Sequence, residues 1–161
     1  MNAQDFIKKY GPTITIATEG STIFPSVAIA QAALESGWGS SGLTKTGNAL
    51  FGIKANDAKS PYWHGKVYTS GTVEYVNGER VNITSGFRAY DSVGDSVRDY
   101  VHFLKSNKRY ENNGVFSATT PEDQAAALKK AGYATDPNYT GKIINIINQY
   151  NLKSFDVKKK L

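Results

Sequence analysis

The sequence predicts an α+β fold in which a helical lobe lies against a small β-hairpin lobe. Three observations support this class: helical spacing of apolar residues in the first 36 positions, one hairpin signature in the middle, and three further helical patterns after residue 91. With 161 residues, of which 40% are hydrophobic and 20% charged, the chain is long enough to bury a core without disulfides. It shows no internal repeat and no interdomain linker, so we expect a single domain over residues 1–161.

Two helices are predicted at the N-terminus. Residues 3–18 carry apolar side chains at helical spacing, but Gly11-Pro12 predicts a break inside this segment, because proline removes a helical hydrogen bond. Residues 25–36 predict a second helix that ends near Gly37, a residue type that is common at helix ends. This second helix is apolar on nearly all sides, which predicts that it is buried.

The middle of the chain predicts loops followed by one β-hairpin. Residues 40–60 are rich in Gly, Ser, Thr and Asn, so we expect a long loop or a few short turns there. Residues 66–76 and 81–90 alternate apolar and polar side chains, as half-buried strands do. Asn77-Gly78 between them is a strong signal for a hairpin turn.

Three helices are predicted in the C-terminal part. Ser92 and Thr120 stand where a side-chain oxygen caps the first turn of a helix, and Gly132 follows the end of the second of these helices. Asp136-Pro137 opens the third. We expect the third helix to bury most of its circumference through Ile143, Ile144, Ile146, Ile147 and Tyr150.

Composition and charge argue against several kinds of chemistry. The chain has no cysteine and two histidines, so a thiolate nucleophile is excluded and we expect neither a metal nor another cofactor. The net charge of +5 favours an anionic partner such as nucleic acid, an anionic lipid surface or an acidic cell-wall polymer. No apolar run reaches the roughly 18 residues of a membrane span, and no signal peptide is visible. We expect the basic tail, residues 153–161, to be flexible.

Glu35 is the first candidate catalytic residue. It lies in the last turn of the apolar helix, where burial and the negative helix end both raise the pKa of a carboxyl group. A carboxyl group that keeps its proton near neutral pH can act as a general acid toward a leaving group. The alternative is that Glu35 pairs with a cation or protrudes into solvent where the helix ends.

Aromatic residues near this carboxyl group suggest a sugar-binding groove. Gly37 and Gly39 leave space beside Glu35, and Trp38 offers an apolar wall. Flat rings suit the faces of sugars, and Tyr62-Trp63 lies in a polar loop where such rings are expected to be exposed. Ordinary core packing is the alternative for the other aromatic residues.

A second carboxylate is needed by most glycoside hydrolases, as a nucleophile or as a base. Glu74 alternates with Val73 and Tyr75 on the predicted hairpin, so its side chain lies on the opposite face of the sheet. If that face lines a cleft, Glu74 faces Glu35. The alternative is a polar residue on the solvent side of the hairpin, and Glu79 in the turn is expected to be solvated.

Five sequence blocks occur in order along nearly the whole chain: AQAALESGWG at 30–39, NALFGIK at 48–54, EY at 74–75, FRAY at 87–90 and AGYATDPNY at 131–139. Together they closely resemble glycoside hydrolase family 73, the N-acetylglucosaminidases of bacterial autolysins, flagellar rod-cap hydrolases and phage lysins. Only the first twenty residues and the basic tail fall outside the resemblance.

The resemblance implies a lysozyme-like fold with a cleft, and hydrolysis of the β-1,4 bond between N-acetylglucosamine and N-acetylmuramic acid in peptidoglycan. It places the general acid on Glu35 and the family's second acidic residue on Glu74. A tyrosine implicated in activity falls on Tyr133, with Tyr139 as the second choice. The candidate substrate-binding residues are Gln31, Trp38, Asn48, Phe51, Tyr62, Trp63 and Tyr139.

Several alternatives stay open at this point. Catalysis can use both carboxylates, or the substrate's own N-acetyl group with Tyr133 holding it in place. The rival functions are a peptidoglycan-binding module without activity and a muramidase that cuts the other β-1,4 bond. Nucleic-acid binding is disfavoured because the basic residues are scattered and form no recognition helix. We expect a monomer that acts on glycan strands at the bacterial cell wall, outside the cell, in the periplasm or on a virion.

Overall fold

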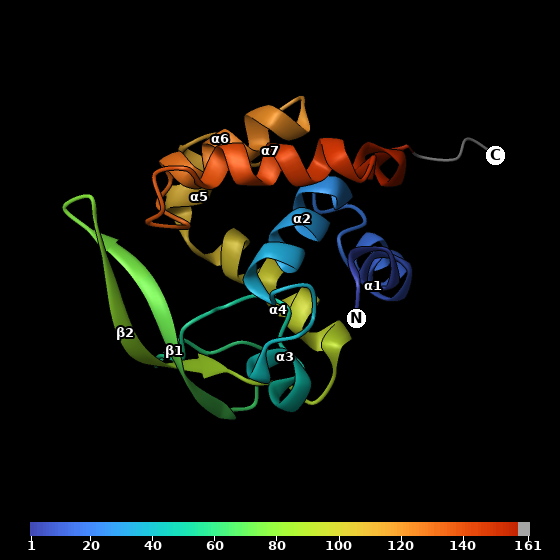
Figure 1. Ribbon diagram of the computed structural model, residues 1–161. Helices are drawn as coiled ribbons and strands as arrows, with labels where there is room; N and C mark the ends of the chain where they lie inside the picture. Colours follow the sequence, from blue (N-terminus) through green and yellow to red (C-terminus); the bar gives the residue numbers. More distant parts are fainter. Residues whose placement is uncertain (158–161) are drawn as a thin grey trace.

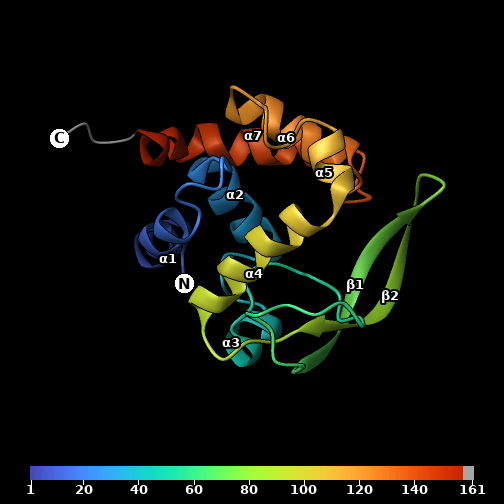
Figure 2. The ribbon, with the colours of Figure 1, turned by 180° about the vertical axis from the view of Figure 1, so that it is seen from behind.

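In the computed structural model, which describes residues 1–157, helices pack around one central helix and a single β-hairpin stands beside them (Figures 1 and 2). The predicted α+β class is confirmed. In chain order the elements are α1 (Ala3–Ala17), α2 (Pro25–Glu35), α3 (Gly42–Gly47), β1 (Val67–Val76), β2 (Glu79–Arg88), α4 (Val93–Ser106), α5 (Lys108–Asn112), α6 (Pro121–Lys130), α7 (Tyr139–Gln149) and the 3-10 helix η1 (Leu152–Asp156). Among the described residues, no helix is both long and apolar enough to cross a membrane.

Helix α2 forms the centre of the core. Eight of its eleven residues are buried, and it packs against α1, α6, α7 and η1. Its many alanines let the surrounding helices approach closely, so a helix that is apolar on nearly all sides is buried, as predicted. This burial carries Glu35, the last residue of α2, to the edge of the core.

Helix α1 is continuous, and the predicted break at Gly11-Pro12 is wrong. Pro12 lies inside the helix, where it removes one backbone hydrogen bond without ending the helix. Gly11 has a packing role instead: a Cβ atom there would come within 2.9 Å of the Phe155 ring. Tertiary packing of the buried face of α1 therefore overrides the local signal.

The hairpin agrees with its prediction within a few residues. β1 and β2 pair in antiparallel register from Val67 opposite Arg88 to Val76 opposite Glu79. Asn77 and Gly78 form the two-residue turn with φ angles of 52° and 81°, and positive φ at both positions is typical of a type I′ turn. Most hairpin side chains are at least partly exposed, so the sheet contributes little to the core.

The predicted helix caps of the C-terminal half are confirmed, whereas two short helices, one elsewhere in the chain and one after α4, escape prediction. Ser92 and Thr120 cap α4 and α6 as expected, each accepting a backbone hydrogen bond three residues on. Helices α3 and α5, of six and five residues, were not predicted. In α7 only one face is fully buried, because Ile144 and Ile146 are half-exposed.

The first residues of the tail that is predicted to be flexible, 153–161, belong to a regular element. Residues up to Asp156 form η1, which packs on α2. The Asp156 carboxylate accepts hydrogen bonds from the backbone N–H and the hydroxyl of Ser26, at 2.8 and 2.6 Å. Residues 158–161 of the predicted tail lie outside the described part of the chain.

Candidate active site

A cleft of about 970 Å³ lies between the hairpin and the helices. One wall is formed by residues 70–75 of β1, and the other by the end of α2 and by residues 132–139 between α6 and α7. Residues 52–56 also line the cleft, together with side chains of α5 such as Arg109 and Tyr110. In both ribbon views the hairpin rises beside the end of α7 where Tyr139 lies, so the cleft runs between parts of the chain that are distant in sequence (Figures 1 and 2).

Glu35 lies in this cleft with its carboxyl group largely surrounded by protein atoms. Loss of hydration raises its pKa from the ordinary 4.5 to about 7, because burial disfavours the charged form. A hydrogen bond from Tyr139 lowers the pKa, and the negative charge of Glu74 raises it by a smaller amount. Burial dominates, and the carboxyl group is therefore about half protonated at neutral pH.

A chain of buried polar groups leads to Glu35 from the core. The Tyr100 hydroxyl donates to Oε1 of Gln31, and Nε2 of Gln31 donates to the Tyr139 hydroxyl at 2.9 Å. The Tyr139 hydroxyl in turn donates to Oε1 of Glu35 at 3.5 Å, a long and therefore weak hydrogen bond. Because Oε1 accepts a hydrogen bond from tyrosine, the carboxyl proton belongs on the other oxygen, Oε2.

Gly52 leaves room next to that second oxygen. A Cβ atom at position 52 would come within 3.4 Å of Oε2 of Glu35 and 3.7 Å of the Phe87 ring. Glycine at this position therefore keeps the proton-bearing side of Glu35 open toward the cleft, where Gly52 is part of the lining.

Glu74 reaches the cleft from β1 and differs from Glu35 in its surroundings. Its Oε1 pairs with the ammonium group of Lys54 at 3.1 Å, and its Oε2 accepts a hydrogen bond from the Thr135 hydroxyl at 2.9 Å. The Thr135 oxygen also accepts the backbone N–H of Tyr75 at 3.0 Å. Thr135 thus joins the hairpin to the loop between α6 and α7 across the cleft.

Tyr133 and Tyr139 both line the cleft. Their ring centres are 6.0 Å apart, and burial together with the nearby Glu35 raises the pKa of both hydroxyls well above the ordinary value. Both tyrosines are therefore neutral hydrogen-bond donors at any physiological pH. Tyr139, the second choice from sequence, is the one that contacts Glu35.

Gln31, Asn48 and Phe51 were predicted to bind substrate, and the structure gives them internal contacts instead. Gln31 is fully buried and bonds to two tyrosines, as described above. Asn48 ends α3 in a left-handed conformation and donates from Nδ2 to the carbonyl of Tyr90 at 3.0 Å. Phe51 is buried and stacks on Tyr100, with ring centres 3.9 Å apart. None of these three residues is among those that line the cleft, so they support its wall from the interior of the protein.

Trp38 does not form the predicted apolar wall beside Glu35. Its ring makes edge contacts with Phe6 and Tyr150, and it is not among the residues that line the cleft. Trp38 has a φ of 56°, so the backbone turns sharply after α2 and carries the ring toward α1 and away from the predicted position.

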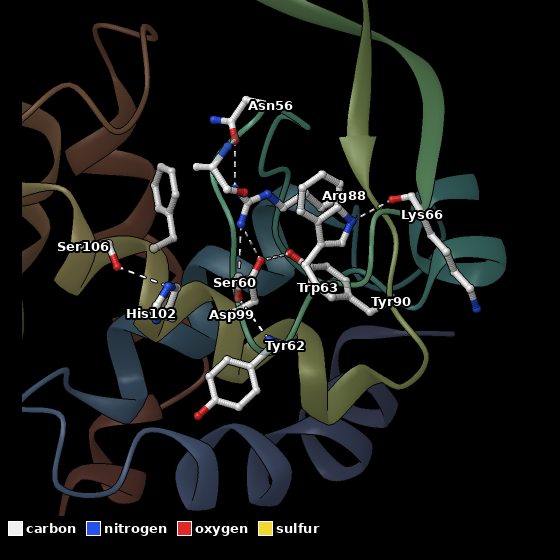
Figure 3. A network of polar contacts seen from close by, with 12 residues as sticks. Asn56, Ser60, Tyr62, Trp63, Lys66, Arg88, Tyr90, Asp99, His102 and Ser106 are labelled. Carbon is white, nitrogen blue, oxygen red and sulfur yellow. Dashed lines mark hydrogen bonds and ion pairs between the residues drawn. The ribbon is translucent and has the colours of Figure 1, made fainter.

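Tyr62 and Trp63 also lie outside the lining of the cleft. Figure 3 shows Trp63 covering Arg88, whose guanidinium carbon is 4.6 Å from the ring centre. Arg88 in turn pairs with the buried carboxylate of Asp99 at 3.0 Å, which ties the end of β2 to α4. Tyr62 extends toward α4 and contacts the His102 ring edge-on (Figure 3). Trp63 therefore packs at the base of the hairpin, and Tyr62 packs against α4.

Sequence reasoning missed several residues of the site: Gly52, Lys54, Tyr100, Arg109 and Thr135. Gly52 and Lys54 lie in the NALFGIK block and Thr135 in the AGYATDPNY block, so those blocks carried a signal for them. Nothing local marks Tyr100 or Arg109, which are brought to the site by tertiary packing. Within residues 1–157, no three His, Asp or Glu side chains gather as a metal site would require.

Comparisons with known proteins identify the family of the chain. Residues 11–152 match the family model Glucosaminidase, described as mannosyl-glycoprotein endo-beta-N-acetylglucosaminidase. The chain is 38% identical to the peptidoglycan hydrolase FlgJ of Salmonella typhimurium, over 98% of this chain and 49% of FlgJ. It is 36% identical to the exo-glucosaminidase LytG of Bacillus subtilis, over 95% of this chain and 53% of LytG. The chain thus spans about half the length of these relatives.

A solved structure has the same fold. The crystal structure of a mutant peptidoglycan hydrolase from Sphingomonas sp. A1 superposes with a TM-score of 0.81 at 36% identity, covering 94% of this chain and 97% of that one. The regions matched by the family model, the relatives and the solved structure all include the residues that line the cleft. The chain therefore belongs to the glucosaminidase family of glycoside hydrolases, glycoside hydrolase family 73.

Proposed function

We propose that this chain hydrolyses the β-1,4 bond between N-acetylglucosamine and N-acetylmuramic acid in peptidoglycan, with Glu35 as the general acid. The observation that carries the proposal is the carboxyl group of Glu35, whose burial raises its pKa to about 7 in an open cleft. The names of the relatives, a peptidoglycan hydrolase and an exo-glucosaminidase, support the substrate class.

In the proposed first step, Oε2 of Glu35 donates its proton to the glycosidic oxygen. The bond between that oxygen and the anomeric carbon breaks, and the leaving sugar departs as an alcohol. Positive charge then develops at the anomeric carbon. Tyr139 supports this step by fixing the Glu35 carboxyl group through Oε1, so that the proton faces the cleft.

In the proposed second step, the carbonyl oxygen of the substrate's N-acetyl group bonds to the anomeric carbon, and water then hydrolyses this cyclic intermediate. Glu35, now ionised, accepts a proton from that water. Two features support substrate assistance over a Glu74 nucleophile: both carboxylate oxygens of Glu74 already have partners, and the neutral Tyr133 hydroxyl lines the cleft, where it can hold the N-acetyl group. Glu74 then stabilises the positive charge as a fixed carboxylate.

We infer that the chain acts at the bacterial cell wall as a monomer. All residues assigned to the reaction come from one chain, so no second copy is needed to complete the cleft. The net charge of +5 favours approach to the acidic wall polymer. No cofactor is required by the steps above, because the proton donor and the charge-stabilising groups are side chains.

The test is digestion of purified sacculi, followed by borohydride reduction and mass spectrometry of the soluble fragments. We expect fragments that end in reduced N-acetylglucosamine. Fragments ending in reduced N-acetylmuramic acid would identify a muramidase instead. Binding to sacculi without release of any fragment would identify a binding module and contradict the proposal.

A further inference from the structure

The cleft is lined by more basic than acidic side chains. Seven charged side chains line it: Glu35, Glu74, Asp136, Lys54, Arg80, Arg109 and Lys142. Lys54 pairs with Glu74 at 3.1 Å, and Lys142 pairs with Asp136. Glu35 is largely neutral below its pKa of about 7. Among the described residues Arg80 and Arg109 have no acidic partner, so positive charges outnumber negative ones in the cleft even when Glu35 is ionised.

Arg109 is exposed, but unlike Arg80 its guanidinium group has contacts within the described part of the chain. Its Nη2 donates to the hydroxyl of the buried Tyr110 at 2.8 Å, and its guanidinium carbon lies 4.8 Å from the centre of that ring. Arg80, at the exposed end of the hairpin, has no side-chain hydrogen bond within residues 1–157. A guanidinium group has five N–H donors, and the described contacts of Arg109 use one of them. Arg109 is therefore oriented and still has donors available to a ligand.

Arg109 lines the same cleft as the catalytic groups, at one end of a row of aromatic rings that leads to Tyr139. The centres of the Tyr110 and Tyr133 rings are 6.3 Å apart, and those of Tyr133 and Tyr139 are 6.0 Å apart. Arg109 also borders Gly132, where a Cβ atom would stand 3.9 Å from Nη1. Because Gly132 has a φ of 89°, glycine is favoured there and the space beside the guanidinium group stays open.

We propose that Arg109 binds a carboxylate of the substrate and so makes the cleft selective for glycan strands that carry acidic groups. This inference rests on the proposed function. A planar guanidinium group matches a carboxylate with two parallel hydrogen bonds. N-Acetylglucosamine is neutral, so the carboxylate belongs to a peptide stem or, on muramic acid that has lost its stem, to the lactyl group. Arg109 would then stand at the part of the cleft that holds muramic acid or its stem.

The test compares three substrates with the wild-type chain and Arg109→Gln. The substrates are intact peptidoglycan strands, the same strands with their carboxyl groups converted to amides, and strands stripped of peptide that keep the lactyl carboxylate. For Arg109→Gln we expect kcat/KM on intact strands to fall about tenfold through KM, the change that loss of about 1.4 kcal/mol of binding gives. On amidated strands the variant and the wild type should be equal.

The substrate comparison separates the outcomes. The lactyl carboxyl group is an amide wherever a stem is attached, so loss on intact but not on stripped strands assigns the site to a stem carboxylate. Loss on both means that Arg109 also binds the lactyl carboxylate that removal of the stem sets free. An equal loss on amidated and intact strands would overturn the proposal, because the side chain would then act without a carboxylate. Full activity of Arg109→Gln on intact strands would overturn it as well.

Two control variants test whether the loss of activity in Arg109→Gln comes from a disturbed structure. Arg109→Lys keeps the charge and removes the planar fork, and we expect an intermediate loss on intact strands alone. Arg98→Gln removes an exposed arginine of α4 that pairs with Asp95 and does not line the cleft, and it should have no effect. Failure of the wild type to release fragments from any of the three substrates would instead refute the proposed hydrolase function.

Discussion

Glu35 and Glu74 face the same cleft from walls of opposite character. Glu35 ends the helix at the centre of the core, and its carboxyl group has lost most of its hydration. Glu74 lies on a two-stranded hairpin that contributes little to the core, and its carboxylate is held by Lys54 and Thr135. The same residue type therefore keeps its proton in one wall and has an ion-pair partner in the other. The surroundings of each carboxyl group therefore decide its proposed role, proton donor for Glu35 and fixed carboxylate for Glu74.

The two walls also differ in how they are held. Helix α2 contacts four other elements, so the position of Glu35 is fixed by the whole core. The hairpin is tied at its base by the buried pair between Arg88 and Asp99 (Figure 3) and at the cleft by Thr135. The position of Glu74 consequently depends on a small number of polar contacts, and each of them can be removed singly.

The largest expected effect is that of Glu35→Gln on activity. Glutamine keeps the shape of the side chain and cannot donate the carboxyl proton, so release of fragments from sacculi should fall by about 10²- to 10⁴-fold. Glu19→Gln, an exposed glutamate outside the cleft, should retain full activity. Substantial residual activity in Glu35→Gln would remove this residue from the role of general acid.

The same substitution should change how stability depends on pH. The folded-state pKa of Glu35, about 7, lies above the ordinary 4.5, so the folded chain binds more protons than the unfolded chain between these values. Stability contributed by the protonated carboxyl group is thus lost as pH rises through 7, to a total of about 3 kcal/mol. Relative to Glu35→Gln, the wild type should lose this amount between pH 4.5 and about pH 8. Denaturant unfolding at a series of pH values measures the difference, and parallel pH curves would contradict it.

Glu74→Gln should have a smaller effect on activity, about tenfold if the carboxylate only stabilises charge. Removing this negative charge should also lower the pKa of Glu35, because Glu74 raises it, and activity should begin to fall at a lower pH. The pH profile of kcat/KM measures both effects. Glu79→Gln on the same hairpin lies outside the cleft and serves as the control. A loss as large as that of Glu35→Gln would instead support a reaction that needs both carboxylates.

Thr135→Val should have the smallest effect. Valine keeps the shape of threonine and removes the hydroxyl that bonds to Glu74 and to the backbone of Tyr75. We expect a loss of up to about 1 kcal/mol in stability and a loss of a few-fold in kcat/KM. Thr84→Val, on the exposed face of β2 away from the cleft, is the matched control. Identical kinetics in Thr135→Val and the wild type would show that this contact does not position Glu74.

Sequence patterns predicted the parts of the fold that local physics decides. The turn at Asn77-Gly78, the caps at Ser92 and Thr120 and the burial of α2 each follow from nearby residues. The break expected at Pro12 failed because packing of α1 against the core outweighs one missing hydrogen bond. Helices α3 and α5 are too short to show a period.

For the site, sequence reasoning located Glu35 and Glu74 in the cleft and misplaced most of the aromatic residues. A carboxylate in an apolar helix is unusual enough to stand out, whereas an aromatic ring in a polar loop can pack in many ways. Trp63 covers the pair of Arg88 and Asp99, a contact between segments far apart in sequence that no local pattern reveals. Roles that depend on tertiary contacts, such as that of Thr135, need the structure.

Titration of the Glu35 side chain by NMR tests its assignment as general acid most directly, with ¹³C-labelled glutamate and Glu35→Gln to assign the carboxyl signal. We expect a midpoint near pH 7, set by burial of the carboxyl group in the wall of the cleft. A midpoint near the ordinary value of 4.5 would mean that the group is ionised under working conditions, and it would contradict the assignment of Glu35 as the proton donor.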